Sequence, residues 1–191
     1  MKTAPDPPPG FQAVLATIQG LSWRKEVSVS EIGAPQRIAP HSVALIAEVV
    51  TKGVEVATGR LIVLHDPAGN PAWDGHYRCV AFARADVEPD MIADPLLSEV
   101  GWSWLLDALA SRGARFSSPS GTVTGMWSQP FGGIRTDAAK AEMEIRASWT
   151  PFLDDPKEIA SHCLTWQDIL CTMGGMPPEP VGVTPLVRIR R

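Results

Sequence analysis

Residues 42–65, SVALIAEVVTKGVEVATGRLIVLH, indicate a β-hairpin because two strand-like segments flank a two-residue turn. Apolar and β-branched residues are dense on both sides of the turn, and this composition is typical of β-strands. Lys52-Gly53 suits a short hairpin loop, which needs residues that tolerate a positive φ. We therefore predict antiparallel strands over 42–51 and 54–65.

The rest of the chain continues this pattern and interrupts it with helices. Further strands are predicted at 26–32, 76–87, 122–129 and 139–149. Apolar residues at helical spacing, with proline or aspartate at the start and glycine at the end, predict helices at 9–19, 95–112 and from Asp155-Pro156 to Gly174.

The order α-β-β-β-β-α-β-β-α predicts an α+β fold, with helices packed on a mainly antiparallel sheet. We expect one such domain over 9–176. A Pro-rich lead-in over 1–8 precedes it, and a Pro/Arg-rich tail over 177–191 follows it.

Composition excludes several classes of protein. Seventeen Lys and Arg against twenty-one Asp and Glu give the 191 residues a net charge of -4, which excludes a generally basic nucleic-acid binder. No apolar run approaches the ~18 residues of a membrane-spanning helix, and residues 1–10 lack the apolar segment of a secretory signal. Three cysteines without such a signal suit a reducing compartment, so we expect a cytoplasmic protein without disulfides.

Motifs of catalysis are absent from the sequence. There is no phosphate-binding glycine loop, no zinc or CxxC motif and no nucleophile elbow. We therefore expect no cofactor and no metal, and the sequence leaves open whether the protein is an enzyme.

The helix predicted over 95–112 is apolar around most of its circumference. Trp102, Leu106 and Leu109 form a second apolar arc, and Trp102 lies ~160° around the helix from Trp104. Another helix of the chain or another subunit must cover this arc. The three residues are our interface candidates.

Histidines and carboxylates gather near a predicted strand connection. Antiparallel pairing would bring His65 and Asp66 close to Asp74 and His76, a set suited to a divalent metal or to acid–base chemistry. The turns at Asp66-Pro67 and Asp74-Gly75 also explain these residues without any site.

Arginines provide two further candidates. Arg78 and Arg84 share a strand face, and Arg60 is placed on the neighbouring strand, so the three could contact an anion or simply cover apolar surface. The tail carries Arg188, Arg190 and Arg191, which could contact phosphate.

Four stretches resemble a known family. They are EIGAPQRIAP at 31–40, ATGRLIVLHDPAG at 57–69, DPLLSEVGWSW at 94–104 and EIRASWTP at 144–151. Together they resemble the actinobacterial domain-of-unknown-function family 3000 (DUF3000), over about residues 11–180. The resemblance implies a cytoplasmic actinobacterial protein, and it implies no catalytic residues.

The expected function is a non-catalytic protein-interaction or self-associating module that uses the Trp102 arc. One alternative is a small-ligand or metal-binding enzyme that uses the corner from His65 to His76. Another is an RNA- or nuclease-associated accessory protein, although we do not expect the acidic body to bind nucleic acid.

Overall fold

The computed structural model describes residues 7–35, 38–134 and 138–176. These residues form a six-stranded sheet in the order β1-β2-β3-β4-β6-β5, and every neighbouring pair is antiparallel. The strands are β1 (Val27–Ile32), β2 (His41–Thr51), β3 (Val54–Asn70), β4 (Gly75–Asp86), β5 (Phe116–Ser128) and β6 (Lys140–Pro151). The predicted α+β class with a mainly antiparallel sheet is confirmed.

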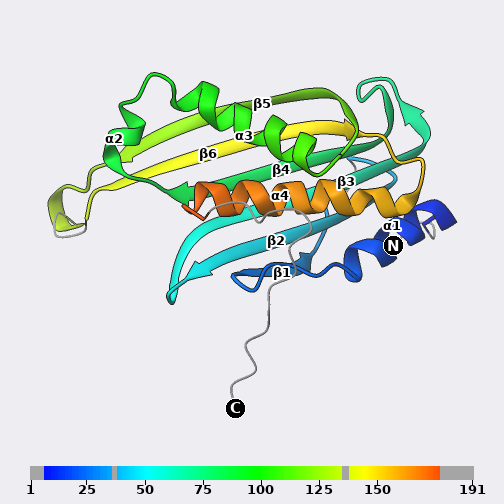
Figure 1. Cartoon of the computed structure of the whole chain (residues 1–191), viewed down its shortest axis with the longest axis horizontal. Helices are drawn as coiled ribbons and strands as arrows, with labels where there is room; N and C mark the ends of the chain where they lie inside the picture. Colours follow the sequence, from blue (N-terminus) through cyan, green and yellow to red (C-terminus); the bar gives the residue numbers. More distant parts are fainter. Residues whose placement is uncertain (1–6, 36–37, 135–137, 177–191) are drawn as a thin grey trace, which may run out of the picture.

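The helices pack on one face of the sheet, as Figure 1 shows for α3 and α4. They are α1 (Pro9–Gln19), α2 (Pro89–Ile92), α3 (Leu97–Ser111) and α4 (Ile159–Met173), with 3-10 turns η1 (Gly132–Ile134) and η2 (Pro156–Glu158). α4 lies over β3 and β4 in the middle of the sheet, and α3 lies beside it over β5. The opposite face carries no helix in the described ranges.

Local signals explain the elements that the sequence predicts well. Lys52 and Gly53 have φ values of 53° and 78°, as a two-residue hairpin turn requires. η2 begins with a capping box in which the Asp155 and Glu158 side chains satisfy each other's backbone N–H groups. α1 has the predicted bounds, with Pro9 at its first position and Gly20 after its last.

Four local features differ from the prediction. The Asp66–Gly69 segment is an irregularity within β3 rather than the end of a strand, because pairing with β4 resumes at Asn70. The Asp94 carboxylate accepts a hydrogen bond from Leu96 N at 2.8 Å, and α3 begins at Leu97, after this local turn. The chain also forms the short α2, and β5 begins at Phe116 rather than at residue 122.

The core lies between the sheet and the helices. Alternate residues of β2, β3, β4 and β6 face α4, whose Trp166 and Leu170 are fully buried. Gly59 lies beneath α4, and a Cβ atom there would come within 2.6 Å of Leu170 Cδ2. Because successive residues of a strand point to opposite sides, the residues between these buried ones lie on the other side of the sheet. Within the described part of the chain, no helix has the length and apolarity needed to cross a bilayer.

Candidate functional site

The face of the sheet opposite the helices is the main candidate surface, and we call it the uncovered face. Strand register fixes which residues share it, because directly paired residues point to the same side. One row runs across five strands through Ile46, Arg60, Phe82, Arg146 and Thr122. The adjacent row contains Ala44, Ile62, Val80 and Ser148. Apolar side chains therefore occupy the centre of a sheet face that no described helix covers.

Two hollows lie on this face, on either side of Phe82. The first, of about 430 Å³, is lined by Ile46, Ile62 and Arg60 together with Phe82. The second, of about 330 Å³, is lined by Val80, Thr122 and Arg146 together with Phe82. Each hollow thus combines apolar walls with one arginine, a combination that suits an apolar group next to a negative charge.

Ion pairs compensate two of the exposed arginines on this face, Arg84 and Arg146, whereas Arg60 has none within the described residues. Arg84 donates to Glu142, and Arg146 Nε lies 2.6 Å from a Glu144 oxygen. Arg146 also lies over the Phe82 ring, 5.9 Å from its centroid, and its side chain remains 68% exposed. Arg60 is exposed and forms no ion pair or hydrogen bond with any other described side chain. Its charge is therefore available to a partner.

Arg78 lies on the same face, but its guanidinium is hydrogen-bonded within the protein. It is 9% exposed, and its terminal nitrogens donate to four oxygens: Ser118 O, Thr150 Oγ1, Ser120 Oγ and Ser148 Oγ. Burial lowers the pKa of Arg78 from its ordinary value. These bonds hold the start of β5 against β4 and β6, so a structural role accounts for Arg78.

The arc predicted as an interface lies largely inside the chain. Leu109 is fully buried, and Trp102 packs against Gly121 of β5, where an added Cβ atom would come within 2.8 Å of the Trp102 ring. Leu106 is partly buried. α3 contacts α4 as well as β5, which explains why it is apolar on two sides. Leu109 is therefore not exposed to a partner.

The predicted histidine–carboxylate corner does not form a metal-ligand group. His65 is 7% exposed, and its ring stacks on Tyr77 with a centroid distance of 4.4 Å. Asp66 accepts a backbone hydrogen bond from Ala68, and Asp74 has a φ of 56° in the hairpin turn. Among the described residues, no three His, Cys, Asp or Glu side chains are placed to hold a metal ion.

His65 and its neighbours form an aromatic stack instead. The His65 ring also stacks on Phe11 of α1, with a centroid distance of 5.3 Å, and on His41 at 5.8 Å. Burial lowers the pKa of His65, and the neighbouring His41 and His76 lower it further. His76 Nδ1 lies 3.3 Å from the Asp66 carbonyl oxygen. The stack attaches α1 to one end of the sheet.

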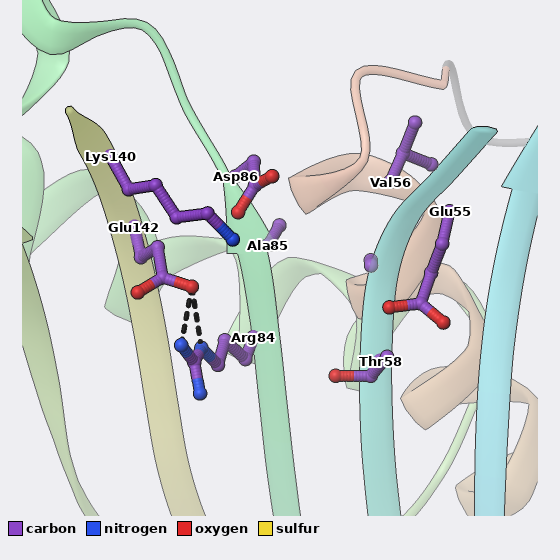
Figure 2. Close-up of a pocket in the computed structure, with 9 residues that line it drawn as sticks. Glu55, Val56, Thr58, Arg84, Ala85, Asp86, Lys140 and Glu142 are labelled. Carbon is purple, nitrogen blue, oxygen red and sulfur yellow. Dashed lines mark hydrogen bonds and ion pairs between the residues drawn. The ribbon is translucent and has the colours of Figure 1, made fainter. Parts of the chain in front are cut away.

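A polar pocket of about 260 Å³ lies where β3 diverges from β4 at the end of the sheet (Figure 2). Figure 2 shows the Arg84 guanidinium bound to the Glu142 carboxylate, with Glu55 on the far wall and Lys140 reaching toward the pocket. The hydrogen bond that Arg84 donates to Glu142 raises the pKa of Arg84, and the Glu142 carboxylate compensates the charge of Arg84. Arg84, a predicted anion contact, is thus compensated within the protein.

His162 is a buried polar group on α4. It is 0% exposed, and its Nδ1 accepts a hydrogen bond from Trp149 Nε1 at 3.0 Å. Its Nε2 has no partner among the described residues. Burial lowers the pKa of His162 to about 4, so the imidazole is neutral at physiological pH.

Sequence reasoning did not single out Phe82, Ile46 and Ile62 as candidate binding residues. Their strands are apolar on both faces, so the sequence pattern does not separate the core from exposed apolar surface. The register of β4 with β6 places Arg146 beside Phe82, and no local sequence motif predicts this long-range pairing. The predicted phosphate contacts Arg188, Arg190 and Arg191 lie outside the described residues.

Comparison with known proteins supports the family resemblance. A family model described as a protein of unknown function, DUF3000, matches residues 7–184. Neither the curated proteins nor the solved structures contain a match to the chain. Because the matched segment spans nearly all of the 191 residues, the chain belongs to the DUF3000 family.

Proposed function

We propose that the protein is a non-catalytic interaction module that binds another protein through the uncovered face. The observation that carries this proposal is the pair of hollows around Phe82, where partly exposed apolar side chains lie next to the uncompensated Arg60. Soluble proteins rarely leave an apolar sheet face bare, and such faces often serve as contact surfaces. The proposal retains the cytoplasmic location that the family resemblance implies.

The uncovered face is a better candidate than the Trp102 arc and the His65 corner, both predicted from sequence. Leu109 and Trp102 are used within the chain, and the His65 corner does not gather its side chains around one point. The two hollows, in contrast, share Phe82 and form one continuous surface across β2, β3, β4, β6 and β5.

Site-specific photo-crosslinking in the native host tests this proposal. A photoreactive benzoylphenylalanine replaces Thr122, an exposed residue that lines the second hollow. The matched control replaces Glu99, an exposed residue on α3. We expect a discrete protein adduct from position 122 and none from position 99. No adduct at position 122, or the same adducts at both positions, would contradict the proposal.

A further inference from the structure

The chemistry of the uncovered face indicates what kind of partner it binds. We infer that the partner presents a short acidic segment, in which a carboxylate meets Arg60 and apolar side chains fill the hollows on either side of Phe82. This inference rests on the proposed function, because it assumes that the uncovered face is the binding surface.

Charge on the face selects a negative partner. Arg60 and Arg146 flank Phe82 in one row, so they are two strand spacings apart, or roughly 10 Å. Both side chains are exposed, but Arg146 pairs with Glu144, whereas Arg60 pairs with no acidic side chain in the described ranges. A carboxylate placed here would form charge-assisted hydrogen bonds at the edge of an apolar surface. The protein as a whole is acidic, with a net charge of -4, so the uncompensated positive charge of Arg60 is a local feature.

The size of the surface suits a segment rather than a folded domain. The row from Ile46 to Thr122 crosses five strands and therefore spans about 19 Å. Two such rows are about 14 Å wide, so the surface has an area of roughly 270 Å². This area is about one third of the surface that each partner buries in a standard interface. An extended chain of about six residues covers 19 Å and points about three side chains at the face.

A second copy of this chain fits the surface less well. A two-fold axis through Phe82 would place the uncompensated Arg60 of one copy against an arginine of the other, Arg60 if the axis runs across the strands and Arg146 if it runs along them. Like charges in direct contact oppose such a pairing. The chain's own tail carries Arg188, Arg190 and Arg191 and has the wrong charge for this face.

Selection from a phage-displayed library of random 12-residue peptides on the immobilised full chain tests the inference. Enriched peptides are synthesised, and their affinities for the unmodified protein, Phe82→Asp, Arg60→Glu and Lys25→Glu are measured by fluorescence anisotropy. Lys25→Glu is the matched control, since it makes the same charge change at an exposed turn before β1. Thermal unfolding verifies that each variant is folded. If Phe82→Asp does not fold, Thr122→Trp fills the second hollow from an exposed position.

The inference predicts peptides rich in Asp or Glu and in large apolar residues. Arg60→Glu is expected to weaken their binding by about tenfold or more, as for loss of a charge-assisted hydrogen bond. Lys25→Glu is expected to leave binding unchanged, and selection on Arg60→Glu should enrich Lys or Arg instead.

Two other outcomes would overturn the inference in distinguishable ways. Peptides that need Phe82 but are neutral or indifferent to Arg60→Glu would refute the acidic segment and leave the uncovered face as the binding surface. No enrichment, or peptides insensitive to both Phe82→Asp and Arg60→Glu, would refute the inference together with the proposed function.

Discussion

His162 makes the stability of the fold depend on pH in a direction that the structure fixes. Its Nδ1 accepts the Trp149 hydrogen bond, so a second proton could bind there only by breaking that bond. Burial lowers the pKa of His162 from 6.5 to about 4, whereas an unfolded chain has the ordinary value. The unfolded state therefore binds more protons between these two values. The stability contributed by neutral His162 is present above about pH 6.5 and is lost as pH falls toward 4.

The magnitude follows from the two pKa values. One pKa unit corresponds to about 1.4 kcal/mol, so lowering the pH from 7 to 5 reduces the free energy of unfolding by about 2 kcal/mol through this group. Burial also lowers the pKa of His65, which acts in the same direction. The contribution of His162 is therefore measured as the difference in pH-dependent stability between the unmodified protein and a variant without this histidine.

Urea denaturation of the unmodified protein and of His162→Gln at pH 7 and pH 5 isolates this contribution. Glutamine offers an amide oxygen to Trp149 and does not titrate. We expect the unmodified protein to lose about 2 kcal/mol more than the variant between these two pH values. Equal losses in the two proteins would refute the reasoning, because they would show that His162 is not buried as a neutral group.

Three further substitutions test the packing of the helices. Asp168→Ala removes the carboxylate that accepts hydrogen bonds from Arg112 at 2.6 and 2.7 Å, and should lower the free energy of unfolding by about 3 kcal/mol in urea. Gly59→Ala forces a methyl group against Leu170 and should cost about 2 kcal/mol, measured in the same way. Trp102→Glu should destabilise the chain by about 3 kcal/mol without changing the subunit count in size-exclusion chromatography. A folded variant that dissociates from a complex would instead restore Trp102 as an interface residue.

The sequence predicts those elements whose causes are local. The 42–65 hairpin follows from Lys52-Gly53, and the start of the last helix follows from the Asp155 and Glu158 capping box. The Asp66–Gly69 segment shows the limit of such signals. Proline, glycine and an aspartate that accepts a backbone hydrogen bond occur both in turns and in irregular strand segments, and only pairing with β4 distinguishes the two.

The candidate surface depends on contacts that the sequence does not encode locally. Arg60 is identified from sequence as a possible anion contact, but its position beside Phe82 and Arg146 requires the strand order β3-β4-β6. Two helices and a strand separate β4 from β6 in the chain. For the same reason, the apolar arc at Trp102 suggests a partner until α4 and β5 are both placed around α3.

Native mass spectrometry of the untagged protein purified from its natural host, with Phe82→Asp as the comparison, tests the central claim most directly. We expect a complex with a second protein for the unmodified chain, and a folded chain without that protein for the variant. A complex that persists unchanged in folded Phe82→Asp would rule out binding through the uncovered face, because the partner would then bind elsewhere on the protein.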